Sequence, residues 1–517
     1  FDITPVSTSV TVSSAFTVAL SANVVTVSAT AHGRTTGDFV FFTSVSEVGG
    51  NINLAGSVFP VSVINSNTFA IDVATTASVA QASQGQGTCH FLLTTGTQNA
   101  ATGLGYGAGS YNAGVAATGA SDFVSQITQW SLDNWGEDIL ANRRGGTIYF
   151  FDTDASTTPI RAVKVSGATN STPTTVNSII VSPNDRHLIT LGSNQFDTTA
   201  SPAGTFEPML VRWSNQEDYT NFVPSVSSTS GESILTDGTK IVGATRSRNA
   251  ISIWTDNSLW QMQFVGPPFT FSFQQQGTNC GLIAPHAVVD YNGVPYWMGY
   301  ENFYAFDGQV KNLPATIRRF VFDDLNLDQK DKIFAGINSE FKEIIWLYPS
   351  GTSNDCNKYV LYSPDENYWT YGTTFFTTFA DRTVFGNTIT TGTTVGGSNL
   401  YNNEPPGVFT GNNEALSSFI ESADFDIEDG NKIMFMSKII PDFDINTGNL
   451  KFSIKTKRYP ESTELIEKGP FTITTGTEKV NLRARGRQGR IRVSCNETGT
   501  QWKWGSLRLE VQPDGDR

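Results

Sequence analysis

The stretch from residue 240 to residue 306 constrains the fold of this chain more than any other part of the sequence. Short runs rich in β-branched and aromatic residues follow one another here, and only a few turn-forming residues, such as Asp256 and Asn257, separate them. This alternation is typical of an antiparallel meander with tight turns. The expected strands are Lys240–Arg246, Asn249–Thr255, Ser258–Phe264, Phe269–Phe273, Ala287–Asp290, Val294–Gly299 and Phe303–Phe306.

Groups of strands that repeat after a longer crossing are typical of the blades of a β-propeller. Each blade is a small twisted sheet that buries its faces only against neighbouring blades, so one such stretch predicts several. Comparable strands extend over residues 130–415, and at roughly 40 to 50 residues per blade this span predicts about six blades. A β-sandwich is the structural alternative, because strand spacing alone does not exclude it.

The composition supports a folded, all-β chain. Its 517 residues leave room for two to four domains. Hydrophobic residues make up 38% and charged residues only 16%, and the 35 Phe, 15 Tyr and 10 Trp residues are enough to fill β cores. One helix is expected at Pro314–Leu325, where apolar residues recur near helical spacing behind a proline.

Changes in composition and strand pattern divide the chain into four parts. Residues 1–102 are expected to form a small β-module, residues 103–125 a Gly-rich arm anchored by Tyr106 and Tyr111, residues 126–415 the propeller, and residues 416–517 a β-sandwich-like domain. The strands expected in the first and last parts are Val24–Ala29, Phe39–Thr43, Val58–Ile64, Thr68–Val73, Ile433–Ile440, Leu450–Lys457, Phe471–Thr474, Gly489–Val493 and Ser506–Val511.

The charge and the cysteines exclude some classes of protein. A net charge of −14 argues against a general nucleic-acid-binding surface, which needs a basic footprint, but not against a channel through which DNA slides.

The four widely spaced cysteines are expected to be buried, unpaired thiols of a reducing compartment. No run is expected to span a membrane or to act as a signal peptide. The sequence begins at Phe1, so we expect either a missing start or processing.

No catalytic or metal-binding motif stands out. The four histidines lie in different segments, and the sequence has no His-Glu-x-x-His, Cys-x-x-Cys, Gly-x-Ser-x-Gly or phosphate-binding loop. These observations predict a protein without a cofactor, metal site or enzymatic activity.

Two acidic clusters are the nearest approach to catalytic chemistry. Asp323-Asp324 and the segment Asp424–Asp429 could in principle supply the two carboxylates of a glycosidase. Solvated turns are the simpler interpretation, because Asp424 and Asp426 alternate with apolar residues as solvent-facing strand positions do. The spacing also lacks the glycine and the distal glutamate of a calcium loop.

The strongest charge signal is a C-terminal series of arginines. Arg483, Arg485 and Arg487 are two residues apart, as are Arg490 and Arg492, so a strand would place each set on one face. Arginines in an acidic protein need partners. They are expected to pair with the acidic clusters or a neighbouring subunit, or alternatively to contact DNA phosphates.

Several segments together resemble a family of bacteriophage proteins. The most specific is Trp130–Asp138, which reads WSLDNWGED. The resemblance covers both ends of the chain and the start of the expected propeller. The segments that carry it are Asp2–Pro5, Ala31–Gly33, Gly37–Val40, Asn67–Phe69, Gly105–Gly109, Trp130–Asp138, Arg483–Arg487, Trp502–Gly505, Arg508 and Pro513–Gly515.

The chain is similar to the tail nozzle proteins of short-tailed phages, also called packaged-DNA stabilisation or tail tubular proteins. The resemblance implies a structural virion protein, assembled in the host cytoplasm, in which a propeller repeats as a homohexameric ring. That ring would contact the tail adaptor and fibre or spike proteins, would retain genomic DNA and would pass it during ejection. No membrane insertion is implied. A DNA conduit also implies a pore that is not continuously basic, because many phosphate contacts would trap the duplex. The alternative function is a glycan-binding or glycan-cleaving tail adhesin.

Overall fold

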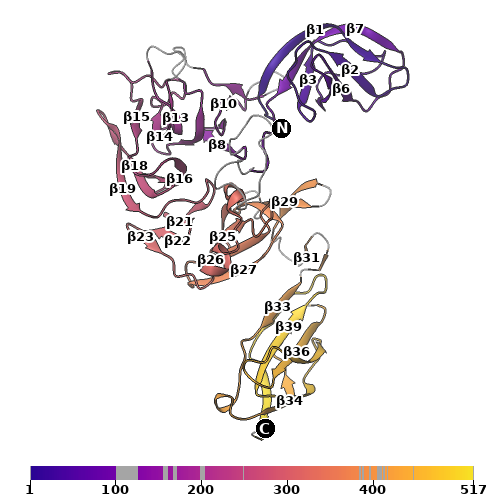
Figure 1. The fold of residues 1–517 in the computed structure, drawn as a ribbon, viewed down its shortest axis with the longest axis vertical. Helices are drawn as coiled ribbons and strands as arrows, with labels where there is room; N and C mark the ends of the chain where they lie inside the picture. The colour runs from indigo at the N-terminus through magenta and orange to yellow at the C-terminus, as the bar shows by residue number, and fades with distance from the viewer. Residues whose placement is uncertain are drawn as a thin grey trace, which may run out of the picture. The chain divides into compact units, whose positions relative to one another are not determined.

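The computed structural model describes residues 2–100, 126–154, 161–166, 172–197, 204–248, 250–383, 386, 389–394, 397–403, 410–411, 414–415, 417–445 and 447–515. The chain divides into two compact units, Phe1–Tyr401 and Asn402–Arg517 (Figure 1). The expected Gly-rich arm and its anchors Tyr106 and Tyr111 lie outside the described residues, and the boundaries expected at residues 102, 125 and 415 stay predictions. None of the described helices is long and apolar enough to cross a membrane.

The N-terminal part of the first unit is a strongly curled, nearly closed sheet of seven strands. Its core contains the rings of Phe16, Phe42, Phe69 and Phe91. The expected strand Val58–Ile64 is divided into two at Val61, whose side chain turns into this core. The strands, in sheet order, are β4 (Val58–Pro60), β3 (Phe39–Thr43), β7 (Gln81–Leu92), β1 (Val6–Val18), β2 (Val24–Ser28), β6 (Thr68–Asp72) and β5 (Ser62–Asn65).

Six consecutive antiparallel sheets follow in the described residues, five of four strands and one of three, which confirms the expected all-β, propeller-like fold. In all six, strands that are adjacent in sequence are also adjacent in the sheet. Their strands are β8 (Trp130–Trp135), β9 (Asp138–Arg143), β10 (Ile148–Phe151) and β11 (Val163–Lys164); β12 (Val176–Val181), β13 (Leu188–Asn194), β14 (Phe206–Trp213) and β15 (Gly231–Ile234); β16 (Ile241–Ser247), β17 (Ala250–Thr255), β18 (Ser258–Gly266) and β19 (Thr270–Thr278); β20 (Val288–Tyr291), β21 (Val294–Met298), β22 (Phe303–Phe306) and β23 (Val310–Asn312); β24 (Phe334–Asn338), β25 (Glu343–Tyr348), β26 (Lys358–Ser363) and β27 (Tyr368–Thr373); and β28 (Phe376–Ala380), β29 (Ile389–Thr394) and β30 (Gly397–Asn402).

Buried tryptophans hold the middle blades together. Trp254, Trp297 and Trp346 come from three successive blades, are fully buried, and belong to one continuous hydrophobic cluster. The ring of Trp297 packs edge-on against Trp254 with a centroid distance of 5.3 Å and stacks on Tyr304 at 5.4 Å. The blades therefore bury their faces against one another, as the propeller prediction requires.

The expected helix Pro314–Leu325 is shorter than predicted. Helix α1 covers only Arg318–Phe322, and a 3₁₀ helix, η1 (Leu327–Lys332), follows it. The reason is a competing backbone pairing: Leu325 forms a bridge with Ser350, and the amide of Gly351 donates to the carbonyl of Asp324. These contacts draw the chain out of helical geometry after one turn.

The segment after α1 is bonded to the chain that leads into the first blade. Gln329 and Ala100 exchange hydrogen bonds between side chain and backbone at 3.0 and 2.8 Å. Arg144, just after β9, forms an ion pair with Asp331 at 2.7 Å, and both side chains are mostly buried. These contacts link segments about two hundred residues apart and fix the start of the propeller.

The second unit contains two main sheets that enclose one core. The sheets are β33-β39-β36-β37 and β38-β34-β41, and a two-stranded ribbon, β35-β40, adjoins them. Inward residues of both sheets, such as Phe452, Val493, Met436 and Leu482, share one hydrophobic cluster, so the unit is sandwich-like. The strands are β33 (Ser418–Glu421), β34 (Met434–Ile440), β35 (Phe443–Ile445), β36 (Leu450–Lys457), β37 (Ile466–Ile473), β38 (Val480–Gly486), β39 (Gln488–Cys495), β40 (Trp502–Trp504) and β41 (Arg508–Pro513), with β31 (Thr410–Gly411), β32 (Glu414–Ala415) and a 3₁₀ helix, η2 (Glu428–Gly430), outside the two sheets.

All four cysteines are buried, unpaired thiols, as the sequence predicts. Burial raises the pKa of Cys89 and of Cys356 to about 12 and that of Cys280 to about 11, so these thiols are poor nucleophiles at neutral pH. Cys495 lies in the core of the second unit.

Candidate functional site

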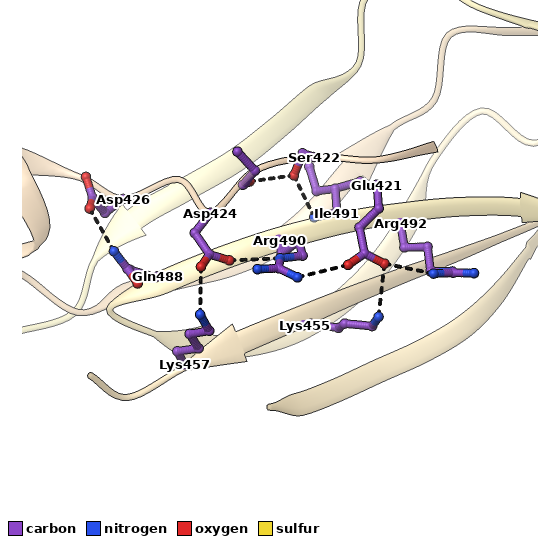
Figure 2. Close-up of polar contacts among 11 residues, drawn as sticks. Glu421, Ser422, Asp424, Asp426, Lys455, Lys457, Gln488, Arg490, Ile491 and Arg492 are labelled. Atoms are coloured by element: carbon purple, nitrogen blue, oxygen red, sulfur yellow. Dashed lines mark hydrogen bonds and ion pairs between the residues drawn. The ribbon is translucent and has the colours of Figure 1, made fainter. Parts of the chain in front are cut away.

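The predicted arginine series is the most highly charged feature of the second unit. Glu421, at the end of edge strand β33, accepts from three cations on the outer face of the sheet (Figure 2). Arg492 lies 2.9 Å away, Lys455 3.0 Å and Arg490 3.1 Å. The strand register places Glu421 directly opposite Arg492, so the β33-β39 pairing itself positions this contact.

Asp424 extends the same network by one step. Its carboxylate accepts from Arg490 at 2.9 Å and from Lys457 at 2.7 Å (Figure 2). The expected strand alternation of Asp424 and Asp426 is not present, because this segment is irregular and its only β-bridge within the described residues joins Phe425 to Gly489. Asp424 is therefore held in ion pairs rather than exposed as a solvated strand residue.

The ion pairs determine the protonation of both carboxylates. Burial raises the pKa of Glu421, but hydrogen bonds from Arg492, Lys455 and Arg490 outweigh this effect and lower the pKa to about 2. The pKa of Asp424 is lowered by its hydrogen bonds to Arg490 and then Lys457. A general acid for glycoside hydrolysis requires a raised pKa. Glu421 and Asp424 have lowered pKa values and therefore do not suit the role of general acid.

The other arginines of the series have different surroundings. Arg487 donates to the backbone carbonyls of Gly430 and Asn431 at 3.0 and 2.7 Å. Arg485 forms an ion pair with Asp514 at 2.7 Å. Arg483 is exposed and forms no ion pair within the described part of the chain. The predicted contacts of the five arginines with a neighbouring subunit or with DNA stay predictions.

Lys455 and Lys457 are the site residues that sequence reasoning missed. They are two residues apart on β36, and the register aligns Lys455 with Arg490 on β39. The sequence signal was present, because two pairs of cations with a spacing of two share one face when their strands pair. What the sequence did not reveal is that β36 and β39 are neighbours.

The predicted acidic pair in the first unit is also divided between structural roles. Asp323 is the C-cap residue of α1, and Asp324 pairs with Lys358 at 2.5 Å. Within the described residues, no group of three His, Cys, Asp or Glu side chains could hold a metal ion.

Asp185, His187 and Thr229 form a hydrogen-bonded series that the sequence motifs did not predict. His187, which is fully buried, contacts Asp185 at 2.6 Å through Nδ1 and Thr229 at 2.9 Å through Nε2. The order of groups resembles an activated nucleophile. However, the Thr229 hydroxyl also accepts from the amide of Gln216 and lies 3.0 Å from Asn215 Oδ1, in a half-buried loop of the second blade. The series therefore ties loops of this blade together.

The Trp130–Asp138 segment connects the first blade to its neighbours. Trp135 is buried, and the Asp133 carboxylate accepts from the amide of Val181 at 2.6 Å and from the guanidinium of Arg246. Val181 belongs to the second blade and Arg246 to the third. The segment that carries the family resemblance thus acts as a connector between three blades.

Comparisons with known proteins give weak matches only. No family model matches the chain, and no curated protein matches it. Among solved structures, an apocarotenoid oxygenase from Synechocystis has a TM-score of 0.30 and 6% identity, over 77% of this chain and 89% of that one. The endosialidase of phage phi92 has a TM-score of 0.19 and 15% identity, over 80% and 66%. An exo-β-1,3-galactanase from Phanerochaete chrysosporium has a TM-score of 0.23 and 9% identity, over 74% and 94%.

These matches correct the prediction that the chain has no enzymatic activity. The oxygenase, the endosialidase and the galactanase are enzymes, so the prediction that this chain has no enzymatic activity does not hold and is withdrawn. Missing short motifs are weak grounds for it, because one fold supports many chemistries. Two of the three names concern glycans, and none is a tail nozzle protein. At these TM-scores and identities, the matches assign no activity to this chain.

The Glu421 network gives a first testable prediction. Glu421→Gln removes the charge that three cations share, so we expect the second unit to lose about 1–2 kcal/mol of stability at pH 7. Because its folded pKa is lowered, Glu421 stabilises the fold above its ordinary pKa and loses this contribution as the pH falls toward 2. Hydrogen exchange of the β39 amides, measured at pH 7 and pH 3, reports the change. The difference between variant and wild type should shrink at pH 3.

Glu464→Gln is the matched control, because Glu464 is exposed and forms no ion pair in the described part of the second unit. It should leave exchange unchanged at both pH values. Equal protection of β39 in Glu421→Gln and wild type at pH 7 would show that the network contributes nothing.

Proposed function

We propose that this chain is a structural subunit of a bacteriophage tail nozzle, a homohexameric ring that retains packaged DNA and passes it during ejection. In this proposal the chain resides in the virion and contacts the tail adaptor and the fibre or spike proteins. The observation that carries the proposal is the scaffold role of the Trp130–Asp138 segment. The residues most similar to nozzle proteins are the ones that join three blades through Asp133.

The distribution of charge supports a conduit for DNA. Residues 402–517 contain 16 Lys and Arg against 17 Asp and Glu, whereas the whole chain has 34 against 48. Nearly all of the excess negative charge therefore lies in residues 1–401. Repeated around a ring, this charge would repel a duplex and limit the phosphate contacts that slow its passage.

A glycan-acting tail adhesin is the second candidate. Two of the similar structures, the endosialidase and the galactanase, are named for glycans, with TM-scores of 0.19 and 0.23. One structural observation supports it independently. Phe320 and Tyr371 form an exposed aromatic pair with a centroid distance of 4.3 Å, beside the Lys358–Asp324 ion pair. An exposed ring with charged hydrogen-bonding groups beside it suits a sugar ring.

The two candidates predict different defects in particles that lack the chain. A missing nozzle should leave capsids that package DNA but lose it, so the fraction of nuclease-resistant DNA should fall at least tenfold. A missing adhesin should leave DNA retention intact and abolish binding to host polysaccharide. Full DNA retention together with lost polysaccharide binding would refute the nozzle and support the adhesin. Phe320→Ala tests the aromatic pair in the same binding assay.

A further inference from the structure

The outer face of the β38-β34-β41 sheet carries an excess of positive charge. Arg483 and Arg485 extend from β38, Lys438 from the central strand β34, and Arg508 from β41. The side chains between them on β38 are buried, so alternation directs the arginines outward. This face is distinct from the Glu421 network, which lies on the other sheet.

Half of these cations have no partner in the described part of the chain. Lys438 pairs with Glu510 at 2.8 Å, and Arg485 pairs with Asp514. Arg483 and Arg508 are exposed and form no ion pair or hydrogen bond with a described side chain. The exposed guanidinium groups of Arg483 and Arg508 therefore lie on either side of β34. The charge of Lys438 on β34 is already neutralised by Glu510.

Apolar side chains share this face. Ile440 is 43% exposed and lies opposite Arg508 in the strand register, and Phe435 lies opposite Arg485. Apolar side chains that stay partly exposed beside arginines are typical of protein interfaces. A DNA-binding surface would need many phosphate contacts, and here Glu510 and Asp514 occupy the same region. The composition of the face therefore favours a protein partner.

A complementary surface exists on the first unit. Asp138 accepts from the amide of Thr153 at 3.0 Å, which places Asp152 beside it in sequence and in space. Tyr219, the neighbour of Asp218, packs on Trp135 and Phe150 of the first blade at centroid distances of 5.5 and 4.7 Å, so Asp218 lies against the same blade. Asp154, close to Asp152 in sequence, is exposed. Other acidic side chains of this unit, such as Asp331 and Asp324, are neutralised by lysine or arginine. These four aspartates form no ion pair within the described residues.

We propose that the Arg483–Arg508 face of one copy docks on the Asp138–Asp152–Asp218 surface of a second copy. Such a contact is heterologous, since two different surfaces meet, and a heterologous contact that repeats around an axis closes into a ring. The inference rests on the proposed ring for its biological meaning. The contact itself is tested as self-association.

The test uses the full chain in sedimentation velocity experiments across a range of concentrations. Arg483→Glu combined with Arg508→Glu should weaken self-association at least tenfold, and so should Asp138→Lys combined with Asp152→Lys. Joining all four substitutions should restore association, because the charges are exchanged rather than removed. Lys503→Glu is the control, since Lys503 is an exposed cation on another strand, and it should change nothing.

Each other result contradicts the inference. Association that persists in the arginine variant places the ring contact elsewhere and leaves the nozzle proposal standing. A loss that the exchanged variant does not reverse removes the aspartate surface as the partner. Unchanged association with weaker binding of a fluorescent DNA duplex would identify DNA as the occupant. A wild-type chain that stays monomeric at every concentration contradicts both the contact and the ring. Circular dichroism confirms that each variant is folded.

Discussion

Replacing Trp297 with alanine will destabilise the propeller by about 3–5 kcal/mol, the usual cost of truncating a buried aromatic side chain. The indole is fully buried, contacts Trp254 and Tyr304, and donates from Nε1 to the carbonyl of Cys280 at 2.8 Å. The substitution leaves a cavity between adjacent blades and an unsatisfied carbonyl. Near-ultraviolet circular dichroism, followed during heating, should show the aromatic signal lost at a clearly lower temperature.

Leu132→Ala provides the matched control for this experiment. Leu132 also lies on a propeller strand, but it is 62% exposed, so its truncation should leave the transition almost unchanged. If Trp297→Ala melted at the wild-type temperature, the blades would not depend on this inter-blade cluster.

Asp133→Ala is expected to loosen the first blade by about 2–3 kcal/mol. The Asp133 side chain is only 10% exposed, and the change leaves the amide of Val181 without an acceptor and Arg246 without its carboxylate. Arg246 is 43% exposed, so solvent replaces part of the lost ion pair. Hydrogen exchange at β8 and β12 should accelerate roughly 30- to 150-fold, while exchange at β36 in the second unit should not change.

Asp133→Asn separates the two contacts of this side chain. The amide oxygen can still accept from Val181, but the charge that pairs with Arg246 is gone, so the acceleration should be smaller than in the alanine variant. Equal exchange in wild type and Asp133→Ala would mean that the resembling segment does not connect the blades. The scaffold argument for the nozzle would then fail.

Strand positions in the propeller were predictable because local sequence determines them. The expected runs Ser258–Phe264 and Phe303–Phe306 correspond to β18 and β22, since turn-forming residues flank both runs and aromatic residues lie within them. The two longest strands of the N-terminal sheet, β1 and β7, were missed. Strand β7 is rich in Gln, Ser and Gly, and its extended form depends on pairing with β1 across about seventy residues.

The candidate site was predictable in its residues but not in its partners. The spacing of Arg490 and Arg492 correctly indicated one face of a strand, as the register shows. Sequence spacing contains no information about which distant strand lies alongside, so Lys455 and Glu421 were not anticipated as neighbours. For the same reason, the sequence predicted a solvated Asp424, whereas the structure pairs it with Lys457 and Arg490.

Class-averaged electron micrographs of the purified full-length chain, or of the tail that contains it, test the central claim most directly. We expect end-on views of a closed ring with six-fold symmetry and an open axial channel. A trimeric spike, or particles of a single chain at every concentration, would contradict the nozzle and favour the adhesin.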